Sequence, residues 1–336
     1  MNRRDWLQMS AAAGIGASLS RAALAAPTAA ATVPSAASAN TSPSSAANAS
    51  SAAVNASSAA VNALRVPTDG TIPVAFLISE GAVLIDFVGP WEVFGSVPRM
   101  AGRNVDPFRL YTVSESAAPV RAGGGMPITP NYTFANAPAP KVIVIPAQSR
   151  PTEAVLAWVR KAAQTADLTM SVCTGAFLLA RTGLLSGKEA TTHHSAYKEF
   201  AMTFPDVRLK RGARFVDMGN VASAGGLSSG IDLALHVVER YFGRDTAVAA
   251  AYYLEYQGQG WTDPNSNSVY AQERPSTDAH PLCPVCNMDV DVSTAPQSKY
   301  QGKTYYFCME SHKALFDSSP GQFLGAAMPA RNPIVA

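Results

Sequence analysis

The chain is poor in charged residues, and one long stretch has none. Residues 22–64 of the 336-residue sequence contain no Asp, Glu, Lys, Arg or His and consist largely of Ala, Ser and Asn. The whole chain carries 26 basic and 24 acidic residues, a formal net charge of +2. Proteins that bind nucleic acid by neutralising phosphates need a clear excess of basic residues. The composition therefore argues against a nucleic-acid partner.

Cysteines and long apolar runs are also scarce. Four cysteines in 336 residues are too few for a scaffold built on disulfides, so their positions matter more than their number. The sequence has no run of about 18 strongly apolar residues, which is the length a membrane-spanning helix requires. We therefore expect no transmembrane span.

The N-terminus has the pattern of an export signal. Arg3 and Arg4 precede a weakly apolar Ala/Gly-rich stretch that ends in Ala23-Leu24-Ala25. The paired arginines make residues 1–26 resemble a twin-arginine (Tat) signal, which implies export of the folded protein, to the periplasm if the cell is Gram-negative. Residues 27–70 are expected to be a disordered Ala/Ser/Asn-rich linker, because small polar residues bury too little surface to offset the entropy of ordering.

Short apolar runs and amphipathic helical patterns alternate over residues 71–262. The runs at 74–78 and 142–145 are typical of strands covered on both faces. Pro151 is expected to open one helix, and a second helix is expected to start at Ser229, with Ser229 and Asp232 as a capping pair. The alternation predicts an α/β fold, with a mostly parallel sheet between helices. We expect a linker at 263–280, a small cysteine-bearing module at 281–325 and a tail at 326–336.

A first candidate site surrounds Cys173. The sequence predicts a buried strand over 168–172, a sharp turn at Cys173-Thr174-Gly175, and a helix over 176–181. A nucleophile on such a turn stands clear of the sheet, and the helix N-terminus favours the thiolate, which predicts a pKa below the free value of about 8.5. The alternative is a small buried apolar residue, since free cysteines are among the most buried residue types.

The sequence around Cys173 resembles the ThiJ/PfpI superfamily, and most closely the branch that holds isonitrile hydratases and the sensor domains of AraC-type regulators. The resemblance covers about residues 72–258 and rests on four blocks, at 83–94, 173–176, 190–193 and 223–235. It implies a flavodoxin-like, class I glutamine-amidotransferase-like fold. It also implies Cys173 as the nucleophile, Asp86 as its acidic partner, Thr174 as a backbone donor to the oxyanion hole, and His193 as a histidine close by. No cofactor is expected for this α/β domain.

The second candidate site is a set of metal-ligand side chains near the C-terminus. Cys283, Cys286, Cys308 and His312 have the spacing C-x2-C-x21-C-x3-H, and two such pairs can close a tetrahedron around one ion. The alternative is a disulfide between Cys283 and Cys286. This segment resembles a YHS domain, a short module of heavy-metal transport ATPases and related proteins. Thiolate ligands suit Cu(I) or Zn(II), and the export signal favours copper slightly.

Two functions remain open at this stage. The first is an exported enzyme that uses Cys173 and Asp86 to add water to a small carbon–nitrogen substrate, with a metal-binding appendage. The second is a non-catalytic periplasmic metal or redox sensor, or a carrier, that uses Cys173 as a redox thiol. The expected partners are a small-molecule substrate and a metal ion, and a homodimer through the α/β domain is compatible with the sequence.

Overall fold

A computed structural model describes residues 63–67, 70–98 and 105–324 of the chain. The predicted signal at 1–26, most of the predicted linker at 27–70 and the predicted tail at 326–336 lie outside the described residues, so these assignments stay predictions. No helix within the described part is both long and apolar enough to cross a membrane.

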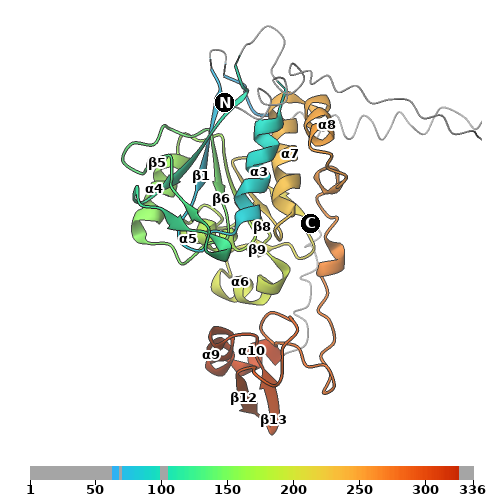
Figure 1. Cartoon of the computed structure of the whole chain (residues 1–336). Helices are drawn as coiled ribbons and strands as arrows, with labels where there is room; N and C mark the ends of the chain where they lie inside the picture. The colour runs from blue at the N-terminus through green and yellow to red at the C-terminus, as the bar shows by residue number, and fades with distance from the viewer. Residues whose placement is uncertain (1–62, 68–69, 99–104, 325–336) are drawn as a thin grey trace, which may run out of the picture. The chain divides into compact units, whose positions relative to one another are not determined.

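A seven-stranded sheet forms the centre of the larger part of the chain (Figure 1). Its strands run in the order β10 (Phe215–Asp217), β11 (Val221–Ala224), β7 (Leu168–Val172), β6 (Val142–Ile145), β1 (Ile72–Leu77), β2 (Phe108–Ser114) and β5 (Tyr132–Thr133). Every neighbouring pair is parallel except β10 with β11. The five strands from β2 to β11 follow the flavodoxin-like order 2-1-3-4-5, which confirms the predicted fold class.

Helices cover both faces of this sheet. On one face α3 (Leu84–Ser96), α7 (Ser229–Phe242) and α8 (Arg244–Tyr253) enclose a core built around Phe76, Phe94 and Leu235. On the other face α4 (Glu153–Ala163), α5 (Gly175–Arg181) and α6 (Tyr197–Thr203) enclose a second core. Because both faces are covered, β1, β6 and β7 consist almost wholly of buried residues, as their continuous apolar runs predicted.

Short elements complete the α/β part. They are β3 (Val120–Arg121), the 3-10 turn η1 (Gly123–Gly125), β4 (Pro127–Ile128), β8 (Glu189–Ala190), η2 (His194–Ala196), β9 (Arg208–Leu209), η3 (Gly260–Thr262) and η4 (Ser268–Tyr270). The last two belong to a segment at 260–271 that hydrogen-bonds to the α/β part, since the Arg214 N–H donates to the Pro264 carbonyl at 2.6 Å.

The N-terminal ends of two helices differ in detail from the prediction, although α7 (Ser229–Phe242) begins at Ser229 as expected. The helix α4 begins at Glu153, one residue after Thr152, whose hydroxyl accepts the Val155 N–H at 3.2 Å and caps the helix, so Pro151 lies outside it. At the start of α7 the predicted capping pair does not form. The Ser229 hydroxyl accepts a hydrogen bond from Asn267 instead, and Asp232 binds Arg214. Tertiary partners therefore outcompete the local cap.

The C-terminal module is a hairpin followed by two helices. The strands β12 (Gln297–Tyr300) and β13 (Lys303–Tyr306) pair antiparallel, and α9 (Glu310–Ser318) and α10 (Pro320–Leu324) follow. Its core is small and consists of the buried residues Cys283, Val285, Cys286, Phe307, Phe316 and Phe323. Two of these six core residues are cysteines, so the apolar core alone is slight for a module of this size.

Candidate functional site

The carboxyl ends of four parallel strands bring the first site together. Asp86 follows β1, Ala147 follows β6, Cys173 follows β7, and a loop at 225–228 follows β11. In open α/β sheets this edge, where the strand order reverses, is the place at which ligands bind. The topology therefore gathers residues that are up to about 140 positions apart in the sequence.

The turn after β7 has the sharp geometry that the sequence predicts. Cys173 has φ +58°, a left-handed conformation that only glycine adopts without strain, and α5 begins two residues later. Gly175 is required there, because a Cβ on it would overlap the backbone carbonyl oxygens of Ile145 and Pro146. The strained cysteine is held by its own N–H, which donates to the Gly225 carbonyl at 2.8 Å. A strained backbone that its surroundings fix in this way is typical of functional sites.

Asp86 is the carboxyl group that the family resemblance pairs with Cys173. It is fully buried on the first turn of α3, and its Oδ2 accepts the Ala147 N–H at 3.0 Å. Burial raises the pKa of Asp86 to about 6, although the hydrogen bond from Ala147 and the nearby Cys173 thiol lower it in part. Because the Ala147 N–H serves Asp86, it is engaged in the resting site and is not free to bind an oxyanion.

Burial also raises the pKa of the Cys173 thiol, contrary to the sequence-based expectation of a low pKa. Cys173 is 7% exposed, and burial, together with the nearby Asp86 charge, raises the pKa of its thiol to about 12. The nearby N–H groups of Thr174 and Leu227 and the Thr174 hydroxyl lower the pKa of the thiol, but they do not offset burial. The predicted low-pKa thiolate is therefore wrong for this structure. A helix of seven residues stabilises a thiolate by less than its burial costs.

At neutral pH these two pKa values give a thiol beside a carboxylate. Asp86 loses its proton near pH 6, far below the thiol, so the carboxylate is the group that can accept the thiol's proton. A neutral thiol with a general base in contact is the resting state of a nucleophile that is activated only during attack. Thr174 directly follows Cys173, and its N–H and hydroxyl lower the pKa of the thiol.

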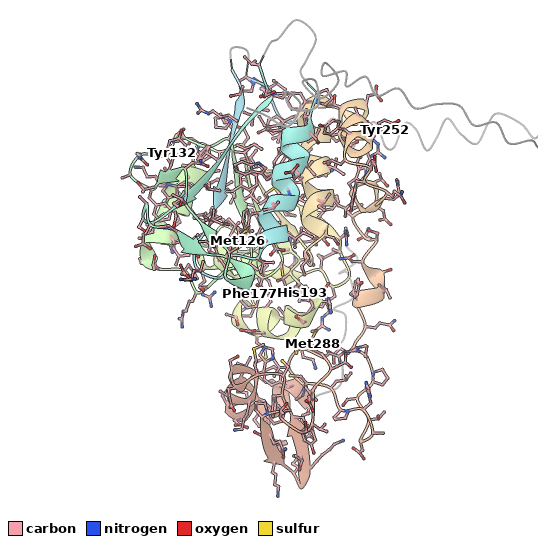
Figure 2. The ribbon with its side chains drawn as sticks, viewed as in Figure 1. Met126, Tyr132, Phe177, His193, Tyr252 and Met288 are labelled. Atoms are coloured by element: carbon pink, nitrogen blue, oxygen red, sulfur yellow. The ribbon has the colours of Figure 1, made fainter. Side chains whose placement is uncertain are left out.

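His193 lies at the same end of the sheet but bonds elsewhere (Figure 2). Its Nδ1 accepts the Ser195 N–H at 3.2 Å and lies 2.8 Å from the Ser195 hydroxyl. Burial lowers the pKa of His193 to about 4, so the ring is neutral at pH 7. Its ring packs against Gly226 and stacks on His194, with 4.3 Å between ring centroids. His193 thus lies against the loop at 225–228, and these hydrogen bonds of its ring go to Ser195 and not to Cys173.

The four C-terminal ligand residues also lie together. The Sγ atoms of Cys283, Cys286 and Cys308 and one ring nitrogen of His312 all lie within 4.8 Å of one another. Individual separations are 3.5 Å between the sulfurs of Cys286 and Cys308, and 3.7 Å and 3.2 Å from His312 Nδ1 to Cys283 and Cys308. A tetrahedral zinc site with Zn–S of about 2.3 Å needs donors roughly 3.5–3.8 Å apart. The donor set therefore fits one four-coordinate ion.

Local backbone structure explains this cluster. The turn that carries the first two cysteines closes when the Asn287 N–H donates to the Cys283 carbonyl at 2.8 Å. Asn287 has φ +59°, and asparagine is one of the few residues other than glycine that tolerate this conformation. Hydrogen bonding from Cys286 lowers the pKa of Cys283 to about 3, so a thiolate is present at neutral pH. A metal bound there is held by ligands from the turn and from the start of α9.

The sequence analysis missed a polar group behind the 225–228 loop. Arg214, Asp232 and Asn267 form a hydrogen-bonded set that lies against this loop. These residues have no spacing that marks a motif, and only the fold brings them together. Asp232 and Asn267 are both buried, which is uncommon for these residue types and would mark them as a candidate site, but their burial is known only from the structure.

Comparison with known proteins agrees with this geometry. The model of the DJ-1/PfpI family matches residues 73–240, and that of the YHS domain matches residues 283–327. An isonitrile hydratase from Pseudomonas putida is 32% identical over 190 residues, which cover 55% of this chain and 78% of that protein. The HTH-type transcriptional regulator GbdR from Pseudomonas aeruginosa is 27% identical over 188 residues, and the match covers 50% of that protein.

Solved structures give the same answer for the fold. The crystal structure of a ThiJ/PfpI family protein from Pseudomonas syringae matches with a TM-score of 0.50 and 29% identity, over 58% of this chain and 78% of that one. A putative transcriptional regulator from Vibrio parahaemolyticus also has a TM-score of 0.50 at 22% identity, over 55% of this chain and 100% of that one, and supports the fold alone. The chain belongs to the DJ-1/PfpI family and carries a YHS domain after its α/β domain.

Proposed function

We propose that the α/β domain hydrates a small isonitrile to the corresponding N-substituted formamide. The observation that carries this proposal is the pair formed by the Cys173 thiol and the buried Asp86 carboxyl, whose pKa lies near 6. The similarity to an isonitrile hydratase over 78% of that protein supports the choice of substrate class.

The reaction divides into two steps that need only these two groups. In the first, Asp86 takes the proton of the Cys173 thiol, the sulfur bonds to the terminal isonitrile carbon, and Asp86 returns the proton to that carbon. The product of this step is a thioimidate, R–N=CH–S–Cys. In the second, the Asp86 carboxylate takes a proton from water, the oxygen bonds to the same carbon, and the C–S bond breaks. Asp86 delivers the proton that it took from water to the nitrogen, and the proton of the new hydroxyl passes to the departing sulfur, so the formamide R–NH–CHO leaves with the atoms of one water molecule and the thiol is restored.

The buried thiol disfavours the sensor alternative for Cys173. A redox-sensing cysteine needs an accessible thiolate, because the thiolate is the form that peroxides oxidise. Cys173 is 7% exposed and its pKa is raised to about 12, so it offers little thiolate at pH 7. A general-base mechanism makes use of such a thiol, whereas a redox switch does not.

We propose that the YHS domain binds one Zn(II) or Cu(I) ion through Cys283, Cys286, Cys308 and His312, and that the protein acts in the periplasm after Tat export. The four-donor geometry favours Zn(II), because soft thiolates accept either ion but zinc is the one that takes four ligands in a closed tetrahedron. The bound ion would supply cross-links between the turn and α9, and no step of the hydration is routed through it.

The test measures formamide production by the purified zinc-loaded protein from a series of small alkyl isonitriles, followed by NMR. We expect turnover in the wild type, none above background in Cys173→Ser, and a loss of about a hundredfold or more in Asp86→Asn. Tyr252→Phe is the control, since Tyr252 is 85% exposed on α8 and its substitution should leave turnover intact. Formamide production that persists in Cys173→Ser would exclude this mechanism.

A further inference from the structure

The loop between β11 and α7 holds the candidate nucleophile directly. The Cys173 N–H donates to the carbonyls of Gly225 and Ala224, at 2.8 Å and 3.3 Å. On the same loop, the Leu227 N–H is close enough to the Cys173 sulfur to lower the pKa of the thiol. Leu227 has φ +37°, in the left-handed region that a leucine adopts only when its surroundings enforce it. Something must therefore hold residues 225–228 in place.

Arg214 is one of the groups that hold this loop. Its backbone carbonyl accepts the Gly225 N–H at 2.9 Å, and its Nη2 donates to the Ser228 hydroxyl at 3.0 Å, so one residue bonds both ends of the loop. Its Nε donates to the fully buried Asp232 at 2.7 Å. The Arg214 guanidinium is therefore held rigidly, because its N–H donors bond to Asp232, Asn267 and Ser228 at once.

Asn267 fills the space behind the loop. It is 8% exposed, its Oδ1 accepts from Arg214 Nη1 at 3.2 Å, and its Nδ2 donates to the Ser229 hydroxyl at 3.3 Å. Its Nδ2 lies only 2.9 Å from the position that a Cβ on Gly225 would occupy, so the amide packs directly on the residue that accepts the Cys173 N–H. Asn267 therefore connects Arg214 to the start of α7 and closes the loop from behind.

The segment that carries Asn267 lies outside the region that matches the DJ-1/PfpI family, which ends at residue 240. It is nevertheless firmly attached to the α/β domain. Trp261 is buried, with the Arg244 guanidinium 4.3 Å above its ring, and the Tyr197 hydroxyl accepts the Gly212 N–H beneath the segment at 2.9 Å. Gly212 in turn lies against the backbone of Ser268.

We propose that Asn267 and Arg214 are positioning residues for the Cys173 thiol. Together they clamp residues 225–228, and so fix the Gly225 carbonyl that accepts the Cys173 N–H. The segment at 260–271 is thus a functional part of the site and not only a connection to the next domain. This inference rests on the proposed role of Cys173 as the nucleophile.

The test compares Asn267→Ala, Asn267→Asp and Val269→Ala in the zinc-loaded full chain. The main readout is the rate at which iodoacetamide alkylates Cys173 at pH 8, measured by peptide mass spectrometry, beside the melting temperature and isonitrile turnover. In Asn267→Ala the loop loses its support and water reaches the thiol, so we expect labelling at least five times faster and turnover lower. Asn267→Asp should stay close to the wild type, because a carboxylate still accepts from Arg214 and from the Ser229 hydroxyl.

Val269→Ala is the matched control on the same segment, since Val269 is 76% exposed. Labelling of Asn267→Ala within twofold of the wild type would overturn the proposal, and so would an Asn267→Asp variant as altered as Asn267→Ala. Should Asn267→Ala not fold, Ser228→Ala removes a single bond from Arg214 to the loop, and unchanged labelling in that variant would overturn the proposal equally. If the variants show the expected differences in Cys173 labelling while the wild type does not hydrate isonitriles, that result would contradict the proposed function and leave this inference standing.

Discussion

Replacing Asp86 with Asn should stabilise the fold while it abolishes hydration. A pKa raised from 3.8 to about 6 means that the folded protein holds the Asp86 proton more tightly than the unfolded chain does. Well below pH 3.8 the carboxyl is protonated in both states and does not lower the free energy of unfolding. As the pH rises through 6 the buried group ionises, and the fold loses about 3 kcal/mol, at 1.36 kcal/mol per pKa unit.

The expected gain is smaller than this figure, because the amide brings its own costs. Asp86 Oδ2 accepts the Ala147 N–H, a bond that the amide oxygen can keep, while Oδ1 has no hydrogen-bond partner that meets ordinary geometry. An amide nitrogen placed there needs acceptors, and a buried unsatisfied donor costs about 1–3 kcal/mol. We therefore expect Asp86→Asn to be more stable at pH 7.5 by up to about 2 kcal/mol, which is up to about 8 °C in melting temperature for a domain of this size.

The assay is urea unfolding at pH 5, 6 and 7.5, followed by tryptophan fluorescence. Within the described residues Trp91, Trp158 and Trp261 all lie in the α/β domain, so the signal reports that domain and not the YHS domain. The advantage of the variant should shrink steadily as the pH falls from 7.5 to 5. A variant that is less stable than the wild type at pH 7.5, or an advantage that does not change with pH, would refute the reasoning.

Asp217→Asn provides a control of opposite sign. Burial alone would raise the pKa of Asp217, but the hydrogen bond with His236 and the charge of Arg240 outweigh it and lower the pKa. The folded state therefore favours the ionised carboxylate, so its loss should destabilise the domain at pH 7.5. The two substitutions make the same chemical change at buried carboxyls, and only the direction of the pKa shift distinguishes them.

Three further predictions follow from the same residues. Turnover should fall about tenfold from pH 7 to pH 5 as Asp86 gains its proton with a pKa near 6, and a flat profile of kcat/KM would exclude Asp86 as the base. His312→Ala should lower zinc content per chain and make residues 281–325 sensitive to protease, with 72–258 still protected; a metal-free tail that resists protease as well as the loaded one would contradict this. Changing Arg3 and Arg4 to lysine should trap full-length precursor in the cytoplasm, as measured by fractionation and immunoblotting. Normal export of this variant would rule out the Tat signal.

Periodicity and local spacing account for what the sequence predicted well. The strand at 168–172, the turn at Cys173 and the pattern of metal ligands each depend on residues that are close in sequence or on short apolar runs. The fold class followed from the alternation of such runs. These features are local, so the sequence displays them directly.

Burial and distant partners account for what the sequence did not predict. The Cys173 thiol was expected to ionise readily because its helix is visible in sequence, whereas the packing that buries it is not. Asp232 was expected to cap α7, but Arg214 binds it from a position 18 residues earlier. The brace made by Asn267 depends on a contact across 38 residues to Ser229, and polar side chains of this kind follow no period.

The metal ligands of the YHS domain have a consequence for how that domain responds to oxidation. A metal ion bound by Cys283 and His312 closes a loop of about thirty residues, and closing such a loop in the unfolded chain removes entropy worth about 3–4 kcal/mol if it acts as a disulfide does. A disulfide between Cys283 and Cys286 would close a ring of only four residues and leave β12, β13 and α9 untied. Oxidation would thus exchange a long-range cross-link for a short one, and the domain would lose its order even though its covalent bonds had increased in number.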